Sequence, residues 1–163
     1  MENNIILWQK GNSFTINTLN DFNKMYYSYI VFSYKKNFDK INDSNISEDT
    51  GWGCMLRCGQ MILYQGIKIL TNEDEDILIE KFKDNNQKDF SIHKLCDQKQ
   101  KLGLNINDWI GPYTITYLLK NTLEISNYSD KISISIFENN TIFKNYKINK
   151  KNLIFIPLRL IIS

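Results

Sequence analysis

The sequence lacks an excess of charge of either sign. Twenty lysine and arginine residues stand against eighteen aspartate and glutamate residues, which gives a formal net charge of +2 at pH 7. The basic residues are spread along the chain and are not gathered on one stretch. Because proteins that bind nucleic acid concentrate lysine and arginine on one face or in one tail, this distribution argues against a nucleic-acid partner.

The chain also lacks a secretory leader and a long apolar run. Residues 1–10 contain Glu2 and a short isoleucine and leucine run, without a basic leader or a small-residue cleavage site, so they do not resemble a signal peptide. The apolar tail at 153–162 is interrupted by Pro157 and Arg159 and is about half as long as a membrane-spanning helix. We therefore expect a cytoplasmic protein without a transmembrane segment, in which the tail forms a buried strand.

Cysteine is scarce, with only three residues, Cys54, Cys58 and Cys96. An odd number in a chain without a secretory leader argues against a disulfide framework and favours a reactive or metal-binding thiol. Hydrophobic residues make up 42% of the 163 residues, which is enough to bury one sizeable core. We therefore expect a single globular domain over residues 1–163.

Hydrophobic periodicity predicts helices first and strands later, which is an α+β order. A polar loop is predicted at 39–53. Within the helix predicted at 54–70, Gly59 and Gly66 indicate close packing against a neighbour. Ser91 is the expected N-cap of a later helix. The predicted helices span 20–38, 54–70, 77–82, 92–99 and 113–123, and the predicted strands span 131–137 and 153–158, the latter as a central strand.

The most informative cysteine is Cys54, which follows two glycines and a tryptophan at the start of a predicted helix. Unpaired backbone N–H groups and the positive end of the helix dipole favour thiolate over thiol at such a position. The same N–H groups can hold a substrate carbonyl oxygen and form part of an oxyanion hole. Position alone leaves open that Cys54 is a small buried hydrophobic residue. Cys58, one turn later, is a second candidate, although an inert core thiol is the commoner role.

The segment at 49–61, DTGWGCMLRCGQM, resembles the nucleophile motif of the autophagy cysteine peptidases, a branch of the papain-like group. Further segments agree with this family in the same order: YKKNF at 34–38, FSIH at 90–93 with WIGPYT at 109–114, and IPLRL at 156–160. The resemblance covers nearly the whole chain. It implies a papain-like α+β fold in which residues 1–163 form a single partial peptidase domain.

The resemblance also implies a function, namely a cysteine endopeptidase that cleaves after the C-terminal glycine of a ubiquitin-like autophagy modifier. Such an enzyme trims the modifier precursor and releases the modifier from its phosphatidylethanolamine conjugate, and it needs no cofactor and no metal. The family motifs assign the nucleophile to Cys54, an oxyanion-hole donor to Tyr34, and the residue beside the groove for the glycine tail to Trp109. Without the family, a core role for Tyr34 and a loop-anchoring role for Trp109 stay open.

The sequence lacks the acid and the base that a thiol peptidase requires. Its only histidine is His93, which lies in a segment that is not catalytic in the family. The family's catalytic pair belongs to an Asp-Pro-His string beyond the IPLRL strand, and the 163 residues do not contain that string. Two interpretations stay open, a fragment of a complete enzyme and a shortened relative without activity. In either case we expect an incomplete sheet with exposed apolar faces and poor stability in isolation.

Two other functions are compatible with the sequence. A zinc module is one, because Cys54 and Cys58 at i, i+4 and His93 and Cys96 at i, i+3 together supply four side chains of the kinds that bind zinc. The other is a binding module that keeps the surface for the modifier without the chemistry. The missing Asp-Pro-His string favours the binding module, and a stoichiometric metal in the purified protein would favour the zinc module.

Overall fold

The computed structural model describes residues 5–9, 12–26, 29–138, 141–142, 144–148 and 150–158 of the chain. By its internal contacts the chain divides into two units, Met1–Val31 and Phe32–Ser163. All the candidate site residues belong to the second unit.

The first unit is a hairpin followed by a short helix. Strands β1 (Ile5–Gln9) and β2 (Asn12–Ile16) pair antiparallel, and the sequence patterns did not predict them. Helix α1 spans Leu19–Tyr26. Thr18 and Asp21 cap it reciprocally, because the Thr18 N–H donates to the Asp21 carboxylate at 3.0 Å and the Asp21 N–H donates to the Thr18 hydroxyl at 3.2 Å.

The predicted helix at 20–38 is therefore wrong over its second half. Residues 27–28 lie outside the described residues, and 29–38 contain no helix. Phe32 is 7% exposed and its ring stacks on that of Phe82, with centroids 5.6 Å apart. Packing of this aromatic ring in the core of the second unit has overridden the helical spacing that the sequence shows.

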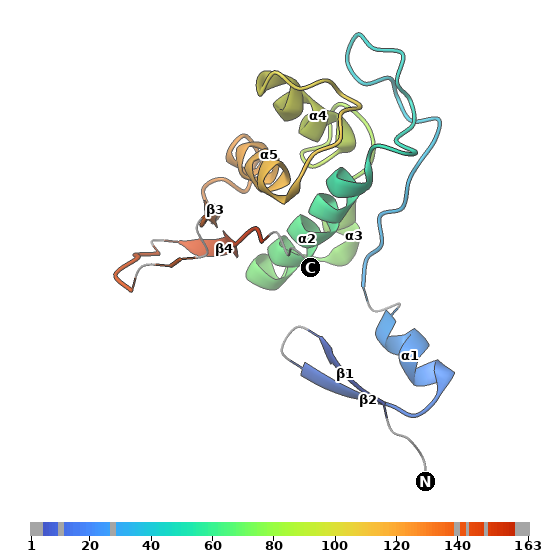
Figure 1. Cartoon of the computed structure of the whole chain (residues 1–163), viewed down its shortest axis with the longest axis vertical. Helices are drawn as coiled ribbons and strands as arrows, with labels where there is room; N and C mark the ends of the chain where they lie inside the picture. Colours follow the sequence, from blue (N-terminus) through green and yellow to red (C-terminus); the bar gives the residue numbers. More distant parts are fainter. Residues whose placement is uncertain are drawn as a thin grey trace, which may run out of the picture. The chain divides into compact units, whose positions relative to one another are not determined.

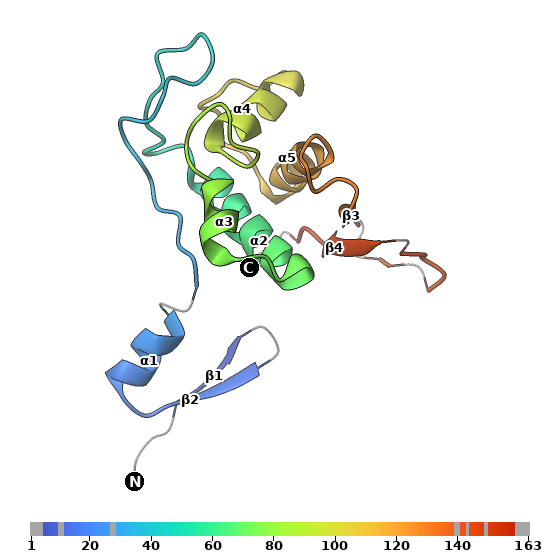
Figure 2. The same cartoon turned by 180° about the vertical axis from the view of Figure 1, so that it is seen from behind.

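The described part of the second unit contains four helices, and their predictions are confirmed. They are α2 (Cys54–Thr71), α3 (Glu75–Glu80), α4 (Ile92–Lys101) and α5 (Pro112–Glu124). Ser91 caps α4 as expected, since its hydroxyl accepts the Lys94 N–H at 3.2 Å. Helix α5 lies between α4 and the strands that follow it (Figures 1 and 2).

Helix α2 packs closely against its neighbours through its two glycines. A Cβ atom on Gly59 would lie 2.7 Å from the side chain of Ile115 on α5, and one on Gly66 would lie 2.6 Å from the side chain of Leu153. The close packing expected from these glycines is therefore confirmed. Buried side chains from α2, α4 and α5 fill the core between them, among them Leu56, Leu63, Ile67, Leu95, Leu118 and Leu119.

Strands β3 (Ile132–Ile136) and β4 (Lys151–Phe155) pair in parallel, with Ile132 opposite Lys151. The strand predicted at 131–137 is confirmed. The strand predicted at 153–158 is found as β4, which begins two residues earlier, at Lys151, and ends three residues earlier, at Phe155. Among the described residues β4 pairs only with β3, and Ile154 is 40% exposed, so the predicted central position is wrong for this part of the chain.

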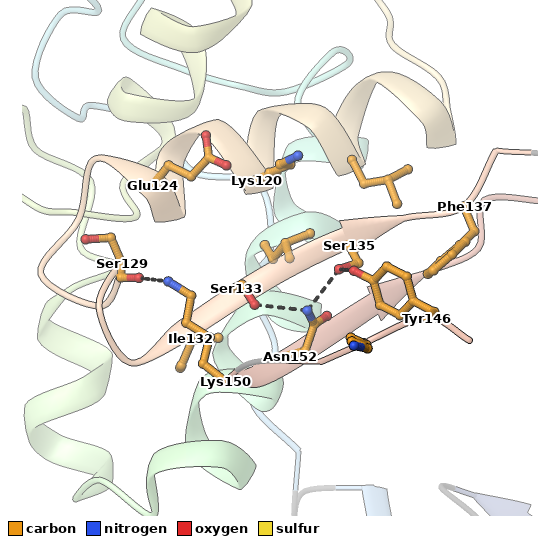
Figure 3. Close-up of a pocket in the computed structure, with 13 residues that line it drawn as sticks. Lys120, Glu124, Ser129, Ile132, Ser133, Ser135, Phe137, Tyr146, Lys150 and Asn152 are labelled. Atoms are coloured by element: carbon orange, nitrogen blue, oxygen red, sulfur yellow. Dashed lines mark hydrogen bonds between the residues drawn. The ribbon is translucent and has the colours of Figure 1, made fainter. Parts of the chain in front are cut away.

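The exposed polar face of the β3–β4 pair borders a pocket of about 510 Å³. Figure 3 shows the amide of Asn152 between the hydroxyls of Ser133 and Ser135, to each of which it donates at 2.9 Å. Tyr146 contacts Ser135 through its hydroxyl. Serine and isoleucine alternate along β3, and the serines make these polar contacts whereas Ile132 and Ile134 are buried.

No helix in the described part of the chain is both long and apolar enough to cross a membrane. The mixture of helices and strands is compatible with the predicted α+β class. The predicted order of helices before strands holds in the second unit but not in the first, where the hairpin comes first.

Candidate active site

Cys54 is the first residue of α2, and its thiol is partly accessible. Gly53 occupies the N-cap position and, because it has no side chain, cannot cap the N–H groups of the first turn. The first turn also carries no acidic residue. The backbone N–H groups beside Cys54 are therefore available to a substrate oxygen, as the sequence predicted for a helix-start cysteine.

The turn before Cys54 is closed by a single backbone carbonyl. Asp49 O accepts the N–H of Gly53 at 2.9 Å and that of Trp52 at 3.3 Å. Gly51 has a φ of 86°, a conformation that favours glycine. A Cβ atom on Gly53 would lie 2.6 Å from the Asp49 side chain. Both glycines of the motif are thus required by the shape of the turn.

Tyr34 lies beside the nucleophile candidate and is 47% exposed, so it is not a core tyrosine. A side-chain hydrogen bond with Cys54 is the largest of the effects that raise the pKa of Tyr34. The phenol therefore stays protonated at neutral pH and can donate a hydrogen bond. The structure brings together two of the three residues that the family resemblance singled out.

Trp109 is the third, and its side chain reaches the same turn. It is 75% exposed, and its indole Nε1–H donates to the carbonyl oxygen of Gly51 at 2.9 Å. Trp109 therefore anchors the turn before Cys54 while leaving most of its ring surface open to solvent.

Three buried charges lie beneath the turn. Arg57 donates from Nε to Asp49 Oδ2 at 2.7 Å and from Nη1 to Asp84 Oδ1 at 2.9 Å. The Arg57 side chain is 2% exposed, that of Asp49 0% and that of Asp84 5%. Burial raises the pKa of Asp84, but its hydrogen bond and charge interactions with Arg57 and Lys35 lower it by more, so this pKa lies below its ordinary value. The guanidinium thus compensates two carboxylates that burial alone would destabilise.

The same network joins the Tyr34 segment to the Cys54 turn. The Lys35 N–H donates to Asp49 Oδ1 at 2.6 Å, and the Asp49 N–H donates to the Lys35 carbonyl at 3.1 Å. Because Lys35 directly follows Tyr34, these bonds hold the phenol next to Cys54. Sequence reasoning missed this role for Asp49 and Arg57. The available indication was an arginine inside the helix predicted at 54–70, whose glycines indicate close packing against a neighbour.

Cys58 and Cys96 occupy different environments. Cys58 is exposed on α2, so its expected role as a core thiol is wrong. Cys96 is fully buried, and burial raises its pKa to about 12. A thiol that stays protonated in this way is a poor nucleophile and a poor metal ligand.

The zinc alternative is not supported. It needs Cys54, Cys58, His93 and Cys96 to converge, yet within the described ranges no group of three or more histidine, cysteine, aspartate or glutamate side chains is placed to hold a metal ion.

His93 is fully buried, and its ring has a structural partner. Its Nε2–H donates to the carbonyl oxygen of Asp39 at 2.6 Å, and the ring packs edge-on against Phe38, with centroids 5.5 Å apart. Among the described residues it makes no hydrogen bond to Cys54. These contacts fix the loop that starts near residue 38.

Comparison with known proteins places the chain in a family. The profile of the Peptidase C54 catalytic domain matches residues 19–163. The cysteine protease ATG4 of Medicago truncatula is 35% identical over 108 residues, which are 58% of this chain and 22% of that protein. The cysteine protease ATG4B of Gallus gallus is 33% identical over 129 residues, 71% of this chain and 32% of that protein. The cysteine protease ATG4A of Homo sapiens is 32% identical over 125 residues, 68% and 31% of the respective chains.

The chain thus spans about a third or less of the length of these curated relatives. The family match, by contrast, extends over most of the chain and includes the Cys54 turn, Tyr34 and Trp109. The chain belongs to the peptidase C54 family, the autophagy cysteine peptidases to which the ATG4 proteases belong.

Proposed function

We propose that the chain is the nucleophile-bearing part of a cysteine endopeptidase that cleaves after the C-terminal glycine of a ubiquitin-like autophagy modifier. The observation that carries this proposal is the position of Cys54 on the first turn of α2, with Tyr34 beside it and Trp109 bonded to the preceding turn. Substrates are the modifier precursor and the phosphatidylethanolamine conjugate of the modifier. Residues 1–163 form a single partial domain of a papain-like α+β fold, and the enzyme works in the cytoplasm without a cofactor.

Catalysis starts with attack of the Cys54 thiolate on the carbonyl carbon of the terminal glycine. The oxygen of that carbonyl becomes negatively charged, and the Cys54 N–H and the Tyr34 hydroxyl donate hydrogen bonds to it. The C–N bond to the leaving amine then breaks as that amine takes a proton from the catalytic histidine. Water hydrolyses the resulting thioester and frees the modifier and the thiol. Trp109 closes a narrow slot that admits only a residue without a side chain.

The acid and the base come from an Asp-Pro-His string that the 163 residues do not contain. We call a chain that continues through such a string the extended chain. His93 is unsuited to the role of base because it is buried and donates to Asp39.

A second candidate function is a modifier-binding module without catalysis. The observation that favours this second function is that His93, the only histidine of the sequence, is buried and bonded to Asp39, so that it cannot act as the catalytic base. The two functions differ in whether the extended chain cuts its substrate.

Replacing Tyr34 with phenylalanine tests the oxyanion role. In the extended chain, Tyr34→Phe should lower kcat by about 10²-fold, the usual effect of removing one oxyanion-hole donor. The measurement is cleavage of a modifier that carries a fluorescent reporter after its terminal glycine. Tyr117→Phe is the matched control, because Tyr117 is a similarly exposed phenol, 38% against 47%, that bonds to Glu138. Equal kcat values for the two variants would remove Tyr34 from the mechanism.

A further inference from the structure

A lysine side chain is buried beneath the loop that carries Trp109. Lys99 on α4 is 0% exposed, which is rare for lysine unless the ammonium is paired. Within the described residues it forms no salt bridge. Burial lowers the pKa of Lys99, and electrostatic interactions with Cys96 and Asp108 oppose this only in part. The ammonium must therefore gain its stabilisation from other contacts.

Those contacts are two backbone carbonyls and one aromatic ring. The Lys99 Nζ donates to the carbonyl oxygen of Ile106 at 2.7 Å and to that of Asp108. It also lies 5.5 Å from the centroid of the Trp52 ring, within the range of a cation–π interaction. The contacts come from the loop before Trp109 and from the turn before Cys54.

The geometry connects both tryptophans of the candidate site to one ammonium. Asp108, whose carbonyl binds Lys99, directly precedes Trp109 in the chain. Trp109 in turn donates to Gly51 O, and Trp52 is the next residue of that turn. Two carbonyls that face inward need a donor, and no side chain other than Lys99 donates to them among the described residues.

The loop is also closed from its outer side. The Asn105 N–H donates to the Asp108 carboxylate at 2.8 Å, and the Asp108 N–H donates to Asn105 O at 3.2 Å. The Leu104 N–H donates to the carbonyl of Lys99 itself at 3.2 Å. The short loop 104–108 is thus bound to Lys99 at both of its ends.

We propose that Lys99 is a positioning residue for the glycine slot: its ammonium fixes the height and orientation of Trp109 over the Cys54 turn. This proposal rests on the proposed function of Trp109 in binding the glycine tail. Lys99 does not touch the reacting atoms, so it acts on substrate fit and not on the chemical step.

The test variant is Lys99→Met, which keeps an unbranched apolar stem against Trp52 but has no donor. In the 163-residue chain, hydrogen exchange of the Trp109 indole N–H, assigned with Trp109→Phe, should become about tenfold faster, because the bond to Gly51 forms less often. Exchange of the core amides on α2 should not change. This readout needs no activity, so it tests the role of Lys99 even if the proposed cleavage fails.

In the extended chain, Lys99→Met should raise KM for the modifier–reporter fusion about tenfold with kcat within about twofold of the parent value. Lys99→Arg keeps the donors and should recover most of the loss. The matched control is Lys101→Met, an exposed position in the last turn of the same helix, which should change neither quantity. If Lys99→Met does not fold, Lys99→Gln takes its place: it removes the ammonium charge and shortens the side chain, so the same changes in Trp109 indole exchange and in KM are expected, in the same direction.

Two results would overturn the proposal. One is a Trp109 indole exchange rate that is the same in Lys99→Met and in the parent chain. The other is a result in which Lys99→Met changes kcat, KM and core amide exchange together and Lys99→Arg does the same. That pattern is expected of a residue that is needed only for the stability of the fold.

Discussion

The 163-residue chain alone is expected to leave the modifier–reporter fusion uncut, and the extended chain is expected to cut it. Cys54 can attack, but the only histidine of the short sequence is not placed to protonate the leaving amine, because His93 is buried and donates to Asp39. Loss of the base or of the nucleophile in such a catalytic group typically costs about 10⁴–10⁶-fold in rate. The measurement is release of the reporter over time at equal protein concentrations.

Two variants make this comparison decisive. Cys54→Ala in the extended chain should abolish the release, whereas His93→Ala should reduce it only as far as it loosens the fold. The opposite pattern, in which the short chain turns over and His93→Ala stops it, would identify His93 as the base and would contradict the assignment of the catalytic histidine to a residue outside these 163.

Replacing Arg57 with methionine is expected to destabilise the fold by about 3–5 kcal/mol, the usual cost of leaving a buried charge without its partner. Arg57→Met leaves the carboxylates of Asp49 and Asp84 with side-chain exposures of 0% and 5% and without their shared guanidinium. Urea unfolding monitored by circular dichroism gives the free energy of unfolding of variant and parent.

The control for this prediction is an exposed ion pair in the same region. Lys36 and Glu48 approach to 3.5 Å, with side chains 67% and 55% exposed, so Lys36→Met should cost at most about 1 kcal/mol. If Arg57→Met costs no more than Lys36→Met, the buried network does not hold the site together. If Arg57→Met does not fold at all, that result agrees with the prediction. Arg57→Lys, which keeps one positive charge, then supplies a measurable difference in the free energy of unfolding.

The sequence predicted the fold well where one periodic pattern matched one element. The helix at 54–70 was found within one residue of its expected bounds, because its apolar period, its glycines and the preceding turn all agree. The prediction at 20–38 failed because Phe32 is used in a different way: its ring packs with Phe82 and Tyr64 in the core. A single-chain pattern shows that a residue is apolar but not which partner buries it.

The candidate site was predictable in part and for a different reason. Cys54, Tyr34 and Trp109 came from motifs, and the structure places Tyr34 and Trp109 against the Cys54 turn. The supporting charges were not predicted, because Arg57 and Lys99 have the residue types of a solvated surface. They are buried only through partners outside their own helices, such as the Asp84 carboxylate and the Ile106 carbonyl. Burial of a charge depends on such pairing, which composition and spacing do not show.

The central claim is that Cys54 is the activated thiol of this chain, and the rate at which each cysteine reacts with iodoacetamide at neutral pH tests it most directly. Peptide mass spectrometry of the native 163-residue chain should show Cys54 labelled several times faster than Cys58, although Cys58 is the more exposed, because only Cys54 lies among the free N–H groups of a helix start. Cys96, buried and with its pKa raised to about 12, should stay unlabelled until urea is added. Labelling of Cys58 as fast as or faster than that of Cys54 in the native chain would contradict the assignment of the nucleophile.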